Sequence, residues 1–283
     1  MDLFYKVLVV VLLVIESAEN RRLEKRKLRG KVLGLPRIIG GHEAVPHAYP
    51  YQAGIVIRGD AFCGGSLISR NFVLTAAHCV DGLHNKDLNL ILGAHRIFED
   101  ESTQVRRQAD WIIVHENYNR HSYENDIALI KLSVPVELND VIKTIPLPES
   151  EGGDDIYSEQ DVISTGWGLT RDVPQPSIND ICPVLQVITL QIISYSSCKA
   201  AFKKDEEHDG LVYVTSKNMC TSGIGIKGTC DGDSGGPLQF NGTQIGIVSI
   251  GTDTCESGAP SIFTRVDKFL DWIQRNSDIS QKS

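Results

Sequence analysis

The sequence has no apolar run long enough to cross a membrane. A helix that spans a bilayer needs about 20 apolar residues, whereas the longest run, residues 7–15, holds nine. Lys6 precedes this run and the small residues Ser17 and Ala18 follow it, which is the pattern of a secretory signal peptide. We therefore expect residues 1–18 to be removed and the mature protein to be secreted, with no membrane partner.

Helical periodicity is also nearly absent. Short β-rich runs separated by turn residues lie at 54–57, 72–74, 88–92, 111–114, 184–193 and 244–250. This spacing predicts an antiparallel sandwich or barrel rather than alternating strands and helices. The pair Asn241–Gly242 between two apolar runs predicts a two-residue hairpin. One amphipathic helix is predicted near the C-terminus by the stripe Val266, Phe269, Leu270 and Ile273.

Basic residues are scarce after residue 37, and so are groups of metal ligands. Residues 38–283 hold 19 Lys and Arg against 32 Asp and Glu, a balance that opposes binding to nucleic acid or to anionic membranes. Six histidines show no metal-ligand spacing, so we expect them at the surface and expect no metal or cofactor. They are His47, His84, His95, His115, His121 and His208.

The most informative stretch is residues 232–238, Gly-Asp-Ser-Gly-Gly-Pro-Leu, which places Ser234 between glycines where a substrate backbone can approach. A serine hydroxyl attacks an amide only with a base beside it and a group that orients this base. His78, in Thr-Ala-Ala-His-Cys, and Asp126, in Asn-Asp-Ile-Ala-Leu, are the candidates. The chain order His, Asp, Ser is that of chymotrypsin-like enzymes, whereas subtilisins and α/β-hydrolases use other orders.

These three blocks, together with Ile-Ile-Gly-Gly from Ile38, resemble the trypsin/chymotrypsin family of secreted serine endopeptidases. The resemblance extends from Ile38 to the C-terminal helix. It implies an all-β fold of two six-stranded antiparallel β-barrels with a C-terminal α-helix that closes the second barrel. The first barrel half, residues 38–148, would carry His78 and Asp126, and the second half, residues 149–283, would carry Ser234.

The resemblance also implies a role for each site residue. Ser234 would attack the scissile carbonyl, His78 would transfer the proton, and Asp126 would orient His78. The backbone amides of Gly232 and Ser234 would form the oxyanion hole. A strand at Ser249, Ile250 and Gly251 would pair with the substrate backbone, with Ile250 in place of the family's aromatic residue.

In the family's pattern, Gly228 forms the floor of the pocket for the residue before the cut bond, and Gly251 and Ser261 form its walls. Gly228 carries no charge, so an arginine or lysine in this pocket would be desolvated without a counter-ion. We therefore expect a chymotrypsin-like preference for large apolar residues. An elastase-like preference is the alternative, because Ser261 narrows the deep end of the pocket.

Residues 19–37 are basic and lack a periodic apolar face, which predicts a flexible activation propeptide. The bond Arg37–Ile38 resembles the family's activation site, where cleavage frees the amino group of Ile38. A buried ammonium needs a partner charge, and the resemblance assigns that role to Asp233. We expect the primary pocket to bind an arginine side chain poorly. The enzyme would then not cut this bond itself, so we expect a separate trypsin-like protease to cut it.

Seven cysteines in a secreted chain indicate disulfides, although their spacing alone does not fix the pairs. The resemblance implies the pairs Cys63–Cys79, Cys198–Cys220 and Cys230–Cys255. Cys182 is then expected to be a thiol in a mobile loop, with an intermolecular bridge as the less favoured alternative.

Asn241 begins Asn-Gly-Thr, an acceptor pattern for N-glycosylation. Ala94 follows Gly93 where calcium-binding relatives carry a carboxylate, so no structural metal is expected.

The expected function is therefore that of a secreted serine endopeptidase with a digestive role. It would act as a monomer on protein or peptide substrates and would meet protein protease inhibitors. A regulatory protease of a cascade is one alternative, weakly disfavoured because no cysteine-rich or adhesive module precedes Arg37. An inactive homologue that serves as a binding module is the alternative from another class. Labelling by an organophosphate would separate this module from an enzyme.

Overall fold

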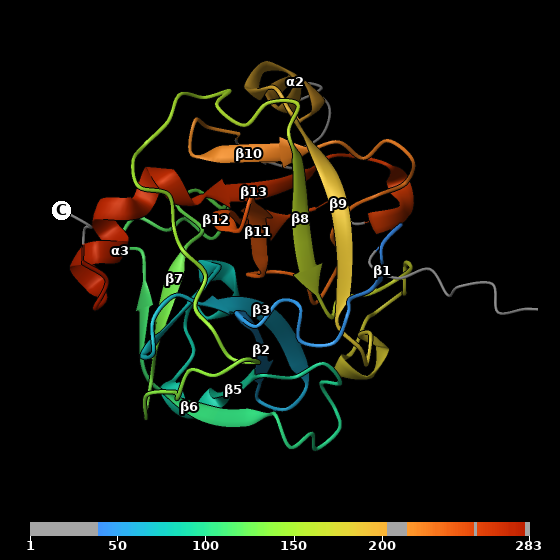
Figure 1. The fold of residues 1–283 in the computed structure, drawn as a ribbon. Helices are drawn as coiled ribbons and strands as arrows, with labels where there is room; N and C mark the ends of the chain where they lie inside the picture. Colours follow the sequence, from blue (N-terminus) through green and yellow to red (C-terminus); the bar gives the residue numbers. More distant parts are fainter. Residues whose placement is uncertain (1–38, 203–213, 252–253, 281–283) are drawn as a thin grey trace, which may run out of the picture. The chain divides into compact units, whose positions relative to one another are not determined.

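The computed structural model describes residues 39–202, 214–251 and 254–280, which lie in one compact unit that begins at Pro36 (Figure 1). The predicted signal peptide, the propeptide and the residues Arg37 and Ile38 fall outside the described part of the chain, as does His208. In the described part, no helix has the length and apolar character needed to cross a membrane.

The first barrel closes in the strand order β2-β3-β4-β7-β6-β5, and all neighbours are antiparallel. Its strands are β2 Gln52–Ile57, β3 Ala61–Leu67, β4 Phe72–Thr75, β5 Leu88–Leu92, β6 Val105–Val114 and β7 Ala128–Leu132. In β5, Leu88, Leu90 and Leu92 are buried while Asn89 is exposed. Because successive side chains of a strand point to opposite faces, the three leucines share the face that packs in the barrel core, whereas Ile91, on the face of Asn89, is buried in a different cluster.

The second barrel has the order β9-β10-β13-β12-β11-β8, and a direct pairing of β8 with β9 closes the ring. Its strands are β8 Asp161–Gly166, β9 Gln186–Ile193, β10 Asn218–Thr221, β11 Pro237–Phe240, β12 Thr243–Ile250 and β13 Ser261–Arg265. The short strand β1, His42–Glu43, pairs with β9 outside the ring. The expected fold class of two six-stranded antiparallel barrels is confirmed.

The predicted hairpin joins β11 to β12. Asn241 and Gly242 have φ angles of 48° and 80°, and a two-residue turn of type I′ requires positive φ at both positions. The amide of Gly242 also donates to Oε1 of Gln239 at 2.7 Å.

The predicted C-terminal helix is present, but it packs differently from the expectation. A 3₁₀ turn, Val266–Phe269, leads into α3, Leu270–Asn276. The other α-helix of the described part is α2, Tyr195–Ala201. Trp272 and Ile273 of α3 join the buried cluster of the first barrel, and Trp272 Nε1 donates to Glu116 at 2.8 Å. The expectation that this helix closes the second barrel is therefore wrong, because its apolar side chains pack against the first barrel.

The three expected disulfides are present, Cys63–Cys79, Cys198–Cys220 and Cys230–Cys255. Cys182 lies outside them. It was expected in a mobile loop, but its side chain is buried and its amide donates to the carbonyl of Trp167 at 2.8 Å. His95 and His115 were expected at the surface and are also buried.

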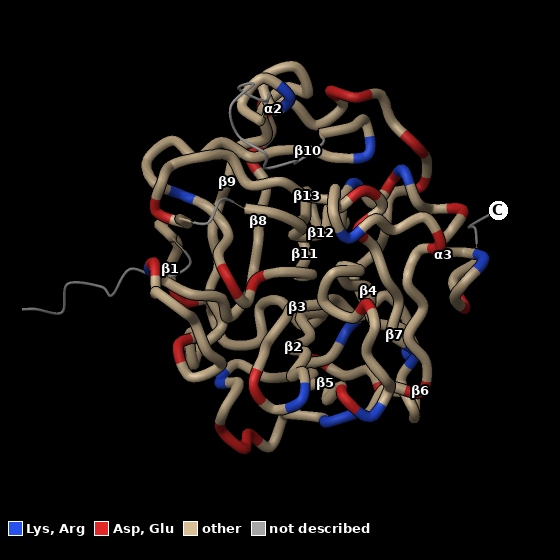
Figure 2. The backbone as a smooth tube through the Cα atoms, turned by 180° about the vertical axis from the view of Figure 1, so that it is seen from behind, with Lys and Arg blue, Asp and Glu red and all other residues tan. Residues whose placement is uncertain are grey.

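Most ion pairs of the described residues have exposed side chains. Acidic and basic residues are interspersed along the backbone of both barrels (Figure 2). Lys131 Nζ lies 2.8 Å from Asp110 Oδ2, with both side chains about half exposed. The pair Arg265–Asp267 differs, because both side chains are 1% exposed and their nearest atoms are 2.6 Å apart. Arg265 also donates to the carbonyls of Gly152 and Gly153. The pair therefore fixes the segment that leads from the first barrel to the second.

Replacing Arg265 by methionine should destabilise the protein by about 3 to 5 kcal/mol, since it leaves the Asp267 carboxylate buried without its partner. The matched control is Lys131→Met, which breaks an exposed pair and should cost about 1 kcal/mol or less. Urea unfolding of both variants with the disulfides intact measures the difference. Equal decreases in the free energy of unfolding of the two variants would show that burial of the Arg265–Asp267 pair does not contribute to stability.

Candidate active site

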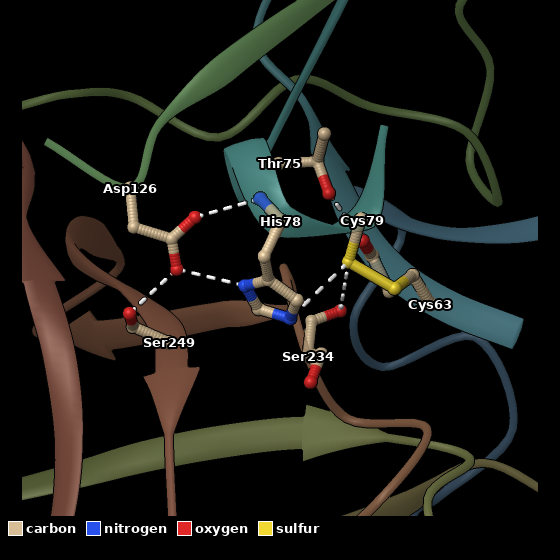
Figure 3. The surroundings of a disulfide bond; sticks show 8 residues. Cys63, Thr75, His78, Cys79, Asp126, Ser234 and Ser249 are labelled. Atoms are coloured by element: carbon tan, nitrogen blue, oxygen red, sulfur yellow. Dashed lines mark hydrogen bonds and ion pairs between the residues drawn. A yellow bond between two sulfur atoms is a disulfide. The ribbon is translucent and has the colours of Figure 1, made fainter. Parts of the chain in front are cut away.

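His78 and Asp126 are brought together by two paired strands. His78 lies in the 3₁₀ turn Ala77–Cys79 that follows β4, and Asp126 lies just before β7, the antiparallel neighbour of β4. The amide of His78 donates to Asp126 Oδ1 at 2.9 Å, and His78 Nδ1 lies 2.8 Å from Oδ2 (Figure 3). A carboxylate accepts hydrogen bonds, so Nδ1 is the donor and Nε2 is left as the acceptor.

The second barrel holds the same carboxylate from the other side. Asp126 is fully buried, and the hydroxyl of Ser249 donates to its Oδ2 at 2.6 Å. The hydroxyl of Thr264 donates to the Asp126 carbonyl at 2.9 Å. Sequence reasoning placed Ser249 only on the substrate strand and missed this contact with Asp126. No local signal in the sequence could have found it, because the two residues are 123 positions apart.

Ser234 lies in a loop that rests on the first barrel. Its carbonyl accepts from the amide of Gly64 in β3 at 2.7 Å. The next residue, Gly235, has a φ of 79°, and a Cβ there would overlap the hydroxyl of Thr75. Only glycine fits both the backbone conformation and this close approach. The glycines around Ser234 therefore allow the loop to dock beside His78.

His78 and Ser234 line one pocket, and the Nε2 side of the ring faces Ser234 in Figure 3. Among the described residues, no hydrogen bond joins the Ser234 hydroxyl to the ring. Catalytic hydrogen bonds are often long before substrate binds and shorten in the complex, so the arrangement is compatible with proton transfer. Gly232 lines the same pocket. The amides of Gly232 and Ser234 donate to no backbone acceptor in the described part of the chain.

Asp233 is a fully buried carboxyl with amide donors on both oxygens. Gly168 donates to Oδ1 at 2.8 Å and Cys230 donates to Oδ2 at 3.0 Å. Burial nevertheless raises the pKa of Asp233 to about 7. Ile38, its expected partner, lies outside the described residues. A carboxyl with such a raised pKa favours a cation at this position.

Of the residues expected to form the primary pocket, Gly228 and Ser261 lie close together. Gly228 and Ser261 are buried, and a Cβ on Gly228 would lie 3.0 Å from Ser261 Oγ. Gly251 is exposed and Ile250 is half-buried at the end of β12. None of these four residues lines the pocket that contains Ser234.

Two clusters of three potential metal ligands occur among the described residues. Each includes two cysteines that form a disulfide, and metals bind the thiolate form of cysteine. In the loop after Gly93, Glu101 Oε2 accepts from the amides of His95 and Arg96 at 2.6 and 2.9 Å. This carboxylate therefore closes the loop through backbone hydrogen bonds.

In the uncleaved chain, Asp233→Asn should remove a pH-dependent loss of stability. Native Asp233 keeps its proton up to about pH 7, whereas an aspartate in the unfolded chain loses it near pH 4. Between these values the native state binds the extra proton, so stability falls as pH rises. We expect the stability gain of Asp233→Asn to grow by a few kcal/mol from pH 4 to pH 7. Urea unfolding in a Ser234→Ala background measures it, and a gain that does not change with pH would contradict the assignment.

Comparisons with known proteins show the family of the chain. The profile of the family described as Trypsin matches residues 38–273. Brachyurin from Leptuca pugilator is 47% identical over 244 residues, which cover 86% of this chain and 100% of that protein. Chymotrypsin-2 from Vespa crabro is 41% identical over 240 residues, 84% of this chain and 99% of that protein. Trypsin-4 from Rattus norvegicus is 36% identical over 252 residues, with coverages of 87% and 94%. This chain belongs to the trypsin family of serine proteases.

Proposed function

We propose that this protein is a secreted serine endopeptidase, made as a zymogen and cleaved after Arg37, in which Ser234, His78 and Asp126 are the catalytic residues. The observation that carries the proposal is the 2.8 Å contact between His78 Nδ1 and the buried Asp126, with His78 and Ser234 lining one pocket. A digestive role, protein inhibitors as partners and a monomeric state belong to the same proposal.

The reaction follows the serine-protease template, whose worked example comes from this family. Ser234 Oγ attacks the scissile carbonyl as His78 Nε2 takes its proton, and Asp126 stabilises the imidazolium. The amides of Gly232 and Ser234 bind the oxyanion, which is worth about 3 to 4 kcal/mol per donor in another serine protease. His78 then gives its proton to the leaving amine, and water releases the acyl group by the same steps.

Activation would supply a cation for Asp233, which forms no ion pair with the described residues. Cleavage after Arg37 would free an ammonium at Ile38, and the adjacent residue Ile39 is buried with its carbonyl accepting from Gly228 at 3.1 Å. The raised pKa of Asp233 supports a partner of positive charge. Pairing would hold Asp233 ionised and order the loop that carries the oxyanion amides.

The primary pocket favours large apolar residues, because its proposed floor, Gly228, has no side chain to balance a cation. The names of the relatives do not decide the preference, since both chymotrypsins and trypsins match. An elastase-like preference is the second candidate, because Ser261 Oγ lies near the position of a Gly228 side chain. Peptides that differ only in the residue before the cut bond distinguish the two.

Gly228→Asp should raise kcat/KM for arginine peptides relative to phenylalanine peptides by about tenfold or more, because it places a counter-ion in a buried pocket. The added Cβ would meet only Ser261 Oγ within 4 Å, at 3.0 Å, so the Ser261 side chain must shift by a few tenths of an ångström to accept it. Gly228→Asn is the matched control of equal size without charge, and it should not favour arginine. If the parent enzyme already preferred arginine, the assignment of the pocket floor would be wrong.

Once cleaved after Arg37, the protein should take up one organophosphate per chain, and Ser234→Ala should take up none. Arg37→Gln should remain uncleaved and unlabelled under activating conditions. Purified zymogen without another protease should also stay intact, since the primary pocket above Gly228 binds arginine poorly. A correctly cleaved chain that takes up no label would instead support the inactive binding module.

A further inference from the structure

Asp126 is the middle residue of a tight turn. The amide of Ile127 donates to the carbonyl of Asn125 at 2.8 Å, and a bond between residues two positions apart closes a three-residue turn. Asn125 has a φ of 54°, a left-handed conformation that asparagine adopts more readily than most residues. The direction of the Asp126 side chain therefore depends on how Asn125 is held.

The side chain of Asn125 is held from both barrels. Its Nδ2 donates to the carbonyl of Asn117, in the loop between β6 and β7, at 2.8 Å. Its Oδ1 accepts from Lys217 Nζ at 2.7 Å, and Lys217 directly precedes β10 of the second barrel. A hydrogen bond from an ammonium is about twice as strong as one between neutral groups. The stronger of the two bonds therefore joins the residue before Asp126 to the second barrel.

Lys217 is itself fixed by β13 and by an aromatic ring. Its carbonyl accepts from the amide of Arg265 at 2.8 Å, and its Nζ lies 5.3 Å from the centroid of the buried Phe269 ring. That distance is within the range of a cation–π contact. Thr264, the residue before Arg265, is the donor to the Asp126 carbonyl. One short stretch of β13 therefore places both Lys217 and Thr264 against the turn.

Neither Lys217 nor Asn125 lines the pocket that contains His78 and Ser234. An effect of these two residues on the reaction must therefore pass through Asp126. In the proposed mechanism this carboxylate keeps the proton on His78 Nδ1 and leaves Nε2 as the base. A misplacement of about 1 Å can lower a rate about 100-fold. The position of the turn therefore affects proton transfer rather than substrate binding.

We propose that Lys217 and Asn125 are positioning residues of the catalytic site. Their hydrogen bond holds the turn that presents Asp126 to His78. The proposal rests on the endopeptidase function proposed above. It adds a cation of the second barrel to the interactions that align the carboxylate of the first.

Steady-state kinetics of the cleaved protein test this role with the best amide substrate of the parent enzyme. Lys217→Met and Asn125→Gly each remove the bond, and glycine keeps the left-handed backbone. Each variant should lower kcat about five- to tenfold and change KM less than twofold, because only the chemical step is affected. Complete organophosphate labelling of Ser234 counts the folded active sites. A merely structural role would reduce the number of labelled chains and leave kcat per labelled chain unchanged.

The double variant shows whether the two residues act through their mutual bond. If they do, Lys217→Met should lower kcat no further once Asn125→Gly has removed the acceptor. The double variant should then have the kcat of Asn125→Gly. Two decreases that multiply would show that the residues act separately and would contradict the proposal.

Matched controls exist for both substitutions. Lys199→Met removes an exposed lysine of α2 whose Nζ lies 5.9 Å from the centroid of the Tyr195 ring. Glu159→Gly places glycine at another left-handed residue, with a φ of 64°. Neither position lines the pocket that contains Ser234, and both variants should keep the parent kcat and KM. A decrease for Lys199→Met equal to that for Lys217→Met would overturn the proposal.

The failures are distinguishable. A parent enzyme that cuts peptides, with Lys217→Met and Asn125→Gly variants that keep its kcat, would overturn the positioning role alone. A correctly cleaved parent that takes up no organophosphate and cuts no peptide would overturn the endopeptidase function and this proposal with it.

Discussion

The buried carboxylate of Asp126 is the interaction on which the site depends. It comes from the first barrel and binds His78 of the same barrel, yet it also accepts a hydrogen bond from Ser249 of the second. A buried carboxylate without such donors would be costly, so its burial requires both barrels to be in place. The loop of Ser234 also depends on both barrels, because the carbonyl of Ser234 accepts a hydrogen bond from the amide of Gly64 in the first barrel. The relative position of base and nucleophile is thus fixed by packing between barrels.

Asp233, the residue directly before Ser234, presents the opposite electrostatic situation. Its oxygens accept from two amides, and burial still raises its pKa to about 7. Asp126 and Asp233 are therefore two fully buried carboxyls that need different partners to be stable in the ionised form. Asp126 finds its donors within the folded chain, whereas Asp233 favours a cation that proteolysis can supply. This contrast connects the zymogen hypothesis to a measurable property of the uncleaved protein.

Local sequence signals predicted the features that depend on local structure. A short β-rich run predicted β5, the pair Asn241–Gly242 predicted a hairpin, and the apolar stripe of residues 266–273 predicted a helix. The identities of His78, Asp126 and Ser234 came from motifs and their order. Features that depend on contacts between distant residues were missed. The stripe of α3 does not specify which barrel it covers, and nothing beside His95 or His115 in the sequence reveals that neighbouring elements bury them.

The same distinction explains why the contact of Lys217 with Asn125 was not foreseen. The two residues are 92 positions apart, and no motif around Lys217 marks it as part of a site. Ser249 and Thr264 are buried donors to Asp126, so changing them would alter stability together with the position of the carboxylate. Lys217 is exposed, so its substitution disturbs less packing. In the proposed reaction, the rate of the chemical step can therefore change through this exposed lysine while the buried donors to Asp126 stay constant.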